Sequence, residues 1–152
     1  MSVPQFGQPA PGHTYPDRPA AFVVVERDGK IAVVRVTFAG GGGRLDLPGG
    51  GIDPGETAAE AAVRECGEEA GLAVAVEAEL TRADHYFTNE DGSRVNTRGT
   101  FFVAALVAPA PHLKIEDDHA LEWMTPQDAL SAVDRDSHAW ALAAWIRRGR
   151  TS

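Results

Sequence analysis

The chain has 152 residues, 43% of them hydrophobic, which predicts one globular domain with its own core. Its 22 acidic and 14 basic residues give a formal net charge of −8, which argues against a nucleic-acid polymer as partner, because phosphate backbones bind basic surfaces. Neither a membrane-spanning apolar run nor a signal-peptide pattern is present, and the single cysteine excludes an internal disulfide, so we expect a cytoplasmic protein that does not bind membranes.

The chain begins with a proline-rich stretch, residues 1–19, which has little periodic pattern. We expect a flexible lead-in there and a single domain over residues 20–150. Two β-branched runs then flank Asp28-Gly29, a pair typical of two-residue hairpin turns. This part of the chain is therefore predicted to be a β-hairpin.

Four consecutive glycines, residues 40–43, predict a flexible connection and a candidate lid over the motif that follows. Phosphate cradling is the alternative, although the spacing of known phosphate-binding loops is missing. Arg44 follows directly and is a candidate substrate contact. A short strand over residues 45–47 should lead into the motif.

A loop shaped by glycine and proline, residues 49–55, leads into a predicted helix. Thr57 is a suitable N-cap, Glu60 three residues later completes a capping box, and Gly71 supplies a left-handed C-cap. Small apolar residues should pack this helix on a sheet: Ala59, Ala62, Val63, Cys66 and Ala70.

The same helix carries three acids on one stripe. At about 100° per residue, Glu65 and Glu69 lie one turn apart with Glu68 beside them. Like charges at this spacing repel, and Arg64 neutralises at most one unit, so a partly buried stripe needs a further counter-charge. A divalent cation meets this need, and oxygen-only ligands favour Mg²⁺ or Mn²⁺ over Zn²⁺. The alternative is a structural acidic face that is simply solvated.

The spacing of the fixed residues resembles the signature box of the Nudix hydrolase family. Those residues are Gly50, Glu56, Arg64, Glu65, Glu68, Glu69 and Gly71, with apolar Cys66 and Leu72 at the two hydrophobic positions. The resemblance holds at every fixed position over residues 50–72. It implies an α/β fold, a mixed β-sheet sandwiched between the box helix on one side and the C-terminal helices on the other.

The resemblance also implies an activity, the metal-dependent hydrolysis of a diphosphate linkage in a nucleoside diphosphate derivative by attack of water on phosphorus. The implied ligands of one to three Mg²⁺ or Mn²⁺ ions are the carbonyl of Gly50 and the carboxylates of Glu65, Glu68 and Glu69. Arg64 corresponds to the arginine that orients these glutamates, and Glu56 to the one that braces the loop.

Beyond the box, residues 74–88 and 98–108 are predicted to be long strands joined by a turn at residues 89–93. Both faces of the first strand carry polar groups, which is typical of a strand that borders a pocket. Candidate contacts for a phosphate, a base or a sugar are Arg82, His85, Tyr86 and Arg98; ordinary surface or core roles are the alternative.

An acidic loop precedes a short strand at residues 122–124. Nudix enzymes often take an extra metal ligand or general base from a loop near this point. Glu116 is the first candidate, followed by Asp118 and Glu122, and a solvated loop is the alternative for each.

Two helices end the chain. Thr125 before Pro126 predicts the start of the first, and the second should begin at Ser137. Its expected apolar face contains Trp140, Ala141, Ala144 and Trp145. His138 is expected to cap the helix or lie at the surface, and reaching the site is the alternative.

The resemblance of the box implies that the substrate contains a diphosphate, but it does not identify the group attached to that diphosphate. Nucleoside triphosphates, oxidised nucleotides, ADP-ribose, dinucleoside polyphosphates and nucleotide sugars all remain candidates. A Nudix-fold sensor or scaffold that binds a nucleotide without cleaving it is the second hypothesis. A homodimer also stays open, because dimerisation is common in the family.

Overall fold

The structure, a computed structural model, describes residues 2–150. Its elements in chain order are β1 (Gln5–Phe6), β2 (Asp17–Arg27), β3 (Lys30–Thr37), β4 (Gly43–Asp46), β5 (Gly49–Gly51), α1 (Ala58–Ala70), β6 (Leu72–Thr88), β7 (Arg94–Pro109), a 3-10 turn (Pro111–Leu113), β8 (His119–Met124), α2 (Pro126–Ala132) and α3 (Asp136–Arg150). The strands and helices expected from the sequence are present, and β1 and β5 are additional.

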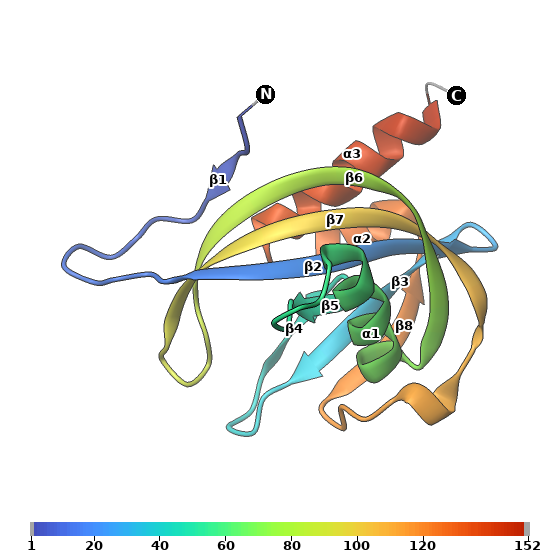
Figure 1. Cartoon of the computed structure of the whole chain (residues 1–152), viewed down its shortest axis with the longest axis horizontal. Coiled ribbons are helices and arrows are strands. Elements are labelled where there is room, and N and C mark those ends of the chain that lie inside the picture. Colours follow the sequence, from blue (N-terminus) through green and yellow to red (C-terminus); the bar gives the residue numbers. More distant parts are fainter. Residues whose placement is uncertain (1, 151–152) are drawn as a thin grey trace.

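The strands form a mixed sheet in the order β1-β6-β7-β2-β3-β4, in which β5 also pairs with β2 and β8 with β3. Strands β2 and β7 run parallel, whereas β6 and β7 run antiparallel. Strands β2 and β3 pair only beside their turn, so β3, β4 and β8 diverge from the rest of the sheet (Figure 1).

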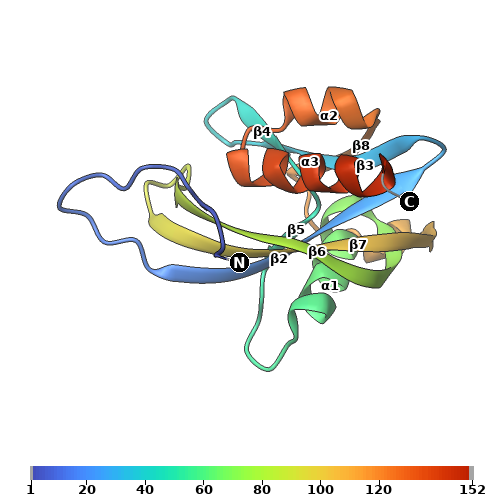
Figure 2. The same ribbon diagram turned by 90° about the horizontal axis from the view of Figure 1, so that it is seen from above.

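Helices cover both faces of the sheet. Helix α1 lies on one side, and α2 and α3 lie on the other (Figure 2). Strand β2 contributes to both cores, since its odd-numbered residues 21–25 pack with α1 and its even-numbered residues 20–24 pack with α2 and α3. The predicted α/β architecture is therefore confirmed, with the box helix and the C-terminal helices on opposite faces.

Helix α1 has the ends that its sequence predicts. The Thr57 hydroxyl accepts from the Glu60 N–H at 3.1 Å, and the Glu60 carboxylate accepts from the Thr57 N–H at 2.9 Å. Gly71 ends the helix in the left-handed conformation, with φ 67°. The buried stripe is rotated from the expected one, because Ala61 is fully buried and Val63 is 37% exposed.

The hairpin between β2 and β3 turns at Asp28 and Gly29, whose φ angles of 52° and 79° are those a two-residue turn of this type requires. Strand β6 departs from strict alternation, because its register against β7 shifts at three points. Beyond the last shift, from Thr81 to Thr88, the pairing with β7 is regular, and the adjacent residues Ala83 and Asp84 are both buried.

The segment before residue 20 contains two strand pairings. β2 begins at Asp17, ahead of the predicted start, and β1 pairs in parallel with β6, with Gln5 opposite Asp84. The flexibility of this lead-in stays a prediction.

Helix α3 buries part of the face expected, since Ala141 is fully buried and Trp145 packs against the core. His138 is 1% exposed, whereas Trp140 is 38% exposed, so the predicted surface position of His138 is wrong. The Nδ1 atom of His138 accepts from the Leu47 N–H at 3.0 Å, which anchors the strand before the box. In the part of the chain that the structure describes, helices long and apolar enough to cross a bilayer are absent.

Candidate functional site

A cavity of about 240 Å³ lies where β4, β5, α1 and the loop before β8 meet. We call it the acidic cavity. Its lining residues are Arg18, Phe22, Arg44, Asp46, Gly49, Gly50, Glu65, Glu69, Glu116, His119 and Arg135. Carboxylates and cationic side chains therefore face the same small space.

Two box glutamates are held by the glycines of β5. The carboxylate of Glu65 lies so close to Gly50 that a Cβ at residue 50 would be 2.7 Å from its Cδ. The Gly49 N–H donates to Glu69 Oε1 at 3.1 Å. Burial raises the pKa of both glutamates, and the charge of Glu69 adds to the effect at Glu65. Both carboxylates are therefore costly to keep ionised here unless a positive charge lies close to them.

Arg64 joins the remaining acids of the box. Its guanidinium donates twice to Glu56, at 2.7 and 2.9 Å, and once each to Glu65 and Glu68, at 3.1 Å. It also donates to the Gly51 carbonyl at 3.0 Å. These hydrogen bonds lower the pKa of Glu56 to about 2 and raise that of Arg64. Arg64 thus links the loop to the helix, and Glu68 faces Arg64 and is not among the residues that line the acidic cavity.

The loop before β8 is fastened to α1 through the backbone. The Glu68 carbonyl accepts from the N–H groups of Ile115 and Glu116, at 3.0 and 3.1 Å. Leu113 packs beside Gly67, where a Cβ would come within 3.2 Å of the Leu113 side chain. These contacts bring Glu116 into the lining of the acidic cavity.

His119 is a site residue that the sequence reasoning missed. Its Nε2 lies 3.2 Å from Glu69 Oε2, and its Nδ1 lies 2.7 Å from Asp118 Oδ1. The hydrogen bond to Glu69 and the charges of both carboxylates raise the pKa of His119 to about 9. Protonated His119 therefore supplies a second positive charge from the chain itself, in addition to Arg64. A divalent cation is not the only group that can compensate the negative charges of the acidic stripe. Its position in the sequence, directly after the acidic residues 116–118, could have identified it as a candidate.

Asp46, Arg44 and Arg135 also line the acidic cavity. Arg44 Nε donates to Asp46 Oδ2 at 2.7 Å, and Arg135 Nε lies 3.6 Å from Asp46 Oδ1. Burial opposes ionisation of Asp46, but the charges of Arg135 and Arg44 outweigh it and lower its pKa. Asp46 follows Arg44 at strand spacing directly before the box, which was a usable signal; the sequence offers none for Arg135.

A second cavity of about 300 Å³ adjoins the first, and Arg44 and Arg135 line both. We call it the aromatic cavity. Its lining residues are Phe38, Gly43, Arg44, His85, Phe87, Thr88, Glu90, Asp134 and Arg135. The glycine-rich loop therefore ends at its edge, and two predicted substrate contacts, Arg44 and His85, lie in it.

The other three predicted substrate contacts line neither cavity. Arg82 pairs with Glu79 at 3.1 Å, and Arg98 pairs with Asp17 at 3.0 Å and with Asp84 at 2.7 Å. Tyr86 packs edge-on against Tyr15, with ring centroids 5.3 Å apart. Their positions support the alternative of ordinary structural roles.

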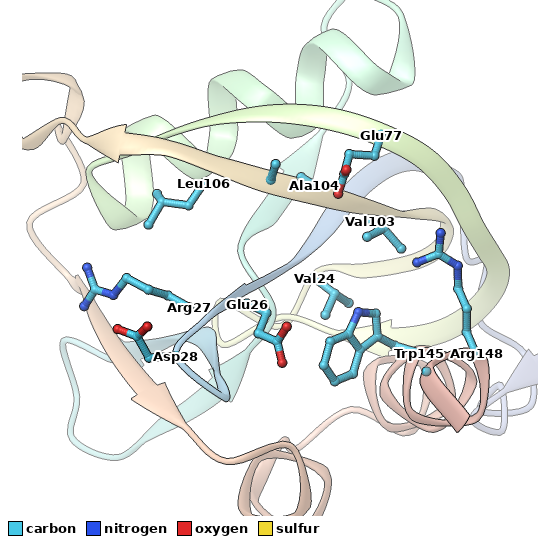
Figure 3. A pocket seen from close by; sticks show the side chains of 12 residues that line it. Val24, Glu26, Arg27, Asp28, Glu77, Val103, Ala104, Leu106, Trp145 and Arg148 are labelled. Carbon is cyan, nitrogen blue, oxygen red and sulfur yellow. The ribbon is translucent and has the colours of Figure 1, made fainter. Parts of the chain in front are cut away.

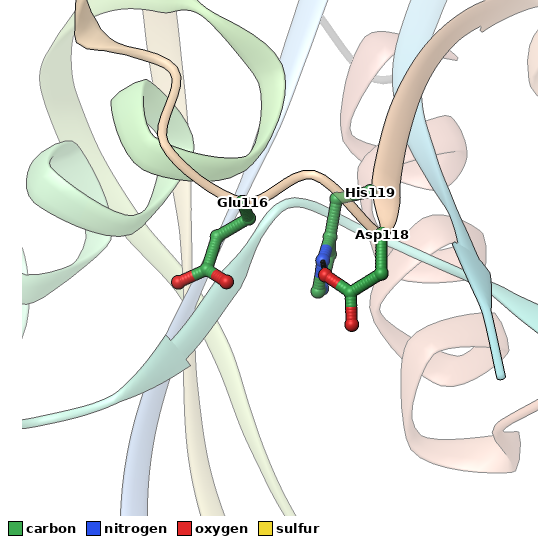
Figure 4. Close-up of side chains that lie close together, drawn as sticks. All are labelled: Glu116, Asp118 and His119. Carbon is green, nitrogen blue, oxygen red and sulfur yellow. Dashed lines mark hydrogen bonds and ion pairs between the residues drawn. The ribbon is translucent and has the colours of Figure 1, made fainter. Parts of the chain in front are cut away.

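The three candidate acids near β8 differ in their access to the acidic cavity. Glu116, Asp118 and His119 have donor atoms within 4.8 Å of one another, and Figure 4 shows the Asp118 carboxylate beside the His119 ring with Glu116 opposite. Glu122, the third candidate, forms an ion pair with Arg35 and is not among the residues that line the acidic cavity. Of the three candidates, Glu116 is the one that reaches this cavity.

The donor set fits a divalent cation. Glu65, Glu69 and Glu116 bring carboxylate oxygens to one cavity, which is the ligand chemistry of Mg²⁺ and Mn²⁺. His119 adds an imidazole nitrogen that an oxygen-only set omits.

A larger cavity, about 770 Å³, lies elsewhere, between the β2–β7 part of the sheet and the C-terminal part of α3 (Figure 3). Its charged lining includes Glu26, Arg27 and Glu77, with Trp145 on one side. It contains none of the box residues, so size does not mark the site of chemistry here.

Over residues 16–147, the sequence matches the family model described as NUDIX domain. The chain belongs to the Nudix hydrolase family. Within this Nudix chain, the signature residues occupy β5, the following loop and α1, the elements that form one side of the acidic cavity.

Solved structures share the fold at low sequence identity. A Nudix hydrolase from Nitrosomonas europaea is 19% identical, covers 87% of this chain and 90% of its own, and has a TM-score of 0.74. A MutT protein from Methanosarcina mazei Go1 is 18% identical, covers 91% and 99%, and has a TM-score of 0.73. At this identity the likeness shows the Nudix fold and leaves the substrate open.

A curated relative from Bacillus subtilis (strain 168), named "Putative 8-oxo-dGTP diphosphatase", is 60% identical over 35 residues. The match spans 23% of this chain and 24% of that protein. The likeness to this relative is thus strong but local.

Proposed function

We propose that the protein hydrolyses a diphosphate linkage in a small nucleotide-type molecule with the help of a divalent cation, Mg²⁺ or Mn²⁺. The observation that carries the proposal is the acidic cavity, which Glu65, Glu69 and Glu116 line together with Arg44 and Arg135. Without a cation, the carboxylates would repel an anionic substrate. The arginines are suited to bind its phosphate oxygens.

Glu65, Glu69 and Glu116 would hold the cation, with Glu68 and the carbonyl of Gly50 as further donors. When bound, a divalent cation screens the diphosphate from the acids and makes water a better nucleophile near neutral pH. His119, whose Nε2 lies 3.2 Å from Glu69 Oε2, supports the proposal because it shows that Glu69 accepts a positively charged neighbour when the imidazole is protonated.

The chain's own groups would do the remaining work. Arg64 holds Glu65 and Glu68 in place through its hydrogen bonds, so it acts by positioning. Arg44 and Arg135 would bind phosphate oxygens. Glu116, or a glutamate of the box, would take the proton from the attacking water. Alignment and charge neutralisation would account for most of the rate.

The test is a substrate panel with Mg²⁺ and with Mn²⁺, read by release of phosphate or pyrophosphate. It should contain nucleoside triphosphates, 8-oxo-dGTP, ADP-ribose, dinucleoside polyphosphates and nucleotide sugars. The name of the Bacillus subtilis relative places the oxidised nucleotide in the panel. We expect metal-dependent cleavage of at least one compound.

Glu69→Gln is the decisive variant, because it removes the charge of a buried acid with little change in shape. Turnover should fall by two orders of magnitude or more, roughly, as for loss of a preorganised charge, and circular dichroism should show an intact fold. Glu79→Gln, on an exposed ion pair with Arg82, is the matched control and should keep full activity. Metal-dependent nucleotide binding without cleavage of any compound would instead favour the sensor.

A further inference from the structure

The chain that leads from β4 into the box donates a backbone hydrogen bond to a side chain at every second residue. These bonds run from the Leu45 N–H to Asp134 Oδ2 at 2.6 Å, from the Leu47 N–H to His138 Nδ1 at 3.0 Å, and from the Gly49 N–H to Glu69 Oε1 at 3.1 Å. The first two acceptors belong to the α2–α3 connection and to α3, and the third belongs to the box helix. Side chains thus take the place that a neighbouring strand would have along this edge, which is the last in the order of the sheet.

We propose that His138 is a positioning residue of the acidic cavity. It fixes the place of Gly49, and through Gly49 that of the Glu69 carboxylate, from the face of the sheet opposite to α1. His138 is not among the residues that line the acidic or the aromatic cavity, so it acts through other residues. The inference rests on the proposed function, because Glu69 matters there as a residue that would hold the cation.

The first link from His138 to Gly49 is the main chain of residues 47–49. Residue 48 is a proline, which has no N–H to donate, so the Leu47 N–H is the donor closest to Gly49 on its N-terminal side. Leu47 is fully buried. Buried N–H groups need an acceptor, so the chain would have to move to pair the Leu47 N–H if Nδ1 were removed.

The second link runs through the ring of Phe22. The His138 ring lies edge-on to it, with centroids 4.5 Å apart. Phe22 pairs with Gly49 across β2 and β5, and a Cβ at residue 49 would lie 2.4 Å from Phe22 Cδ1. Phe22 also lines the acidic cavity. His138 therefore reaches Gly49 by two independent contacts, one through the backbone and one through an aromatic ring.

The His138 ring is kept in the form that accepts a hydrogen bond. It is enclosed between Phe22 and Phe101, whose ring centroids lie 4.5 and 5.4 Å from its own. Burial lowers its pKa to about 3, so the imidazole is neutral at neutral pH. Because Nδ1 accepts from Leu47, the proton of the neutral ring is on Nε2. Leu47 thus has an acceptor with a fixed place and a fixed tautomer.

The first test is amide hydrogen exchange, followed by NMR in the metal-free full chain. The Gly49 amide reports directly on the hydrogen bond to Glu69. In His138→Leu, its exchange should become faster by about tenfold relative to the buried amides of residues 101–104 in β7, a ratio that removes the effect of a general loss of stability. An unchanged ratio would mean that His138 has a merely structural role and would overturn the inference.

Three further variants make this comparison specific. His138→Asn should restore a ratio close to the wild type, because Oδ1 of asparagine stands as many bonds from Cβ as Nδ1 of histidine. Leu142→Val shortens a fully buried side chain of the same helix and should keep the wild-type ratio. If His138→Leu does not fold, His138→Gln replaces it, since its amide oxygen lies one bond further from Cβ. Equal ratios in the asparagine variant and the variant without the acceptor, or an equal rise in Leu142→Val, would contradict the proposal.

The second test is titration with Mn²⁺ together with steady-state kinetics. Residues that hold metal ligands in place matter by about 10- to 100-fold, and His138 acts through a further residue, so His138→Leu should weaken Mn²⁺ binding about tenfold. Its kcat should fall while KM stays within about twofold, because His138 lines neither cavity. A higher KM with unchanged kcat and unchanged Mn²⁺ affinity would overturn the inference.

Hydrogen exchange separates this inference from the proposed function. If the wild type cleaves no compound but the Gly49 ratio rises in His138→Leu and returns in His138→Asn, the function fails and the positioning role stands. If the wild type cleaves its substrate and the ratio is the same in all variants, the function stands and the positioning role fails.

Discussion

Glu65 rests its carboxylate against the backbone of Gly50, where a Cβ would lie 2.7 Å from Cδ and 2.9 Å from each carboxylate oxygen. Strand β5 and helix α1 therefore meet at a distance that only glycine allows. The glycine of the box is thus required by the position of the acid it faces, in addition to any role of its carbonyl.

Gly50→Ala should displace Glu65 or β5, and a displacement of about 1 Å at a reacting group can cost roughly a hundredfold in rate. We expect kcat/KM to fall by about that factor, and any increase in Tm that Mg²⁺ gives the wild type should be lost in the variant. Gly40→Ala is the control, because nothing lies within 4 Å of a Cβ at that position. Full activity of the Gly50→Ala variant would show that Glu65 needs no fixed position.

Arg64→Lys should keep the charge but lose the planar fork that binds Glu56 twice. Because residues that hold metal ligands in place typically matter by about 10- to 100-fold, we expect metal affinity or kcat/KM to fall within that range. Isothermal titration with Mn²⁺ measures the first and steady-state kinetics the second. Arg82→Lys, on the exposed pair with Glu79, should match the wild type in both.

Because of His119, the free energy of unfolding of the metal-free protein, prepared with a chelator, should decrease as the pH rises into the mildly alkaline range. Its pKa is raised from 6.5 to about 9 in the folded protein, so its pairing with Glu69 contributes fully below pH 6.5 and is lost as pH rises toward 9. After allowance for solvent screening, we expect about 1 kcal/mol, or roughly 2–4 °C in Tm. Thermal unfolding between pH 6.5 and 9 measures the slope, and His119→Gln should flatten it.

His138 should make the protein sensitive to acid. Its burial lowers its pKa from 6.5 to about 3, so the unfolded chain binds one more proton between these values. Stability should therefore fall as pH decreases below 6.5, by at most about 1.4 kcal/mol per pH unit. Urea unfolding at pH 4.5 and 6.5 should show a smaller difference in His138→Gln. The exposed His13→Gln serves as control and should keep the wild-type difference.

Local signals in the sequence predicted much of the fold. The capping box at Thr57 and the Asp28-Gly29 turn depend on residues three or fewer positions apart, and both formed as expected. The box also identified the helix that carries the acids, because the spacing of Glu65, Glu68 and Glu69 places them on one side of that helix.

The missed residues depend on contacts between distant segments. His138 is buried, and its Nδ1 accepts a hydrogen bond from the N–H of Leu47, 91 residues away in the sequence. The periodicity of a helix contains no information about such a distant contact. Arg135 reaches both cavities from the connection between α2 and α3, and its sequence context is an ordinary charged run. On strand β6, Arg82 and Tyr86 are also taken up by structural contacts, with Glu79 and with Tyr15, and the contact with Tyr15 comes from a segment that strand alternation does not report.

The loop that carries Glu116 is tied to α1 by its own peptide groups, through the carbonyl of Glu68. Hydrogen bonds between backbone groups do not depend on the side chains of the loop. Residues of the loop can therefore be replaced while the loop stays bound to α1. The acid that completes the cavity could then move by a residue or two during evolution while the main chain keeps its path. A search for that acid is better guided by the carboxyl end of the box helix than by any sequence pattern.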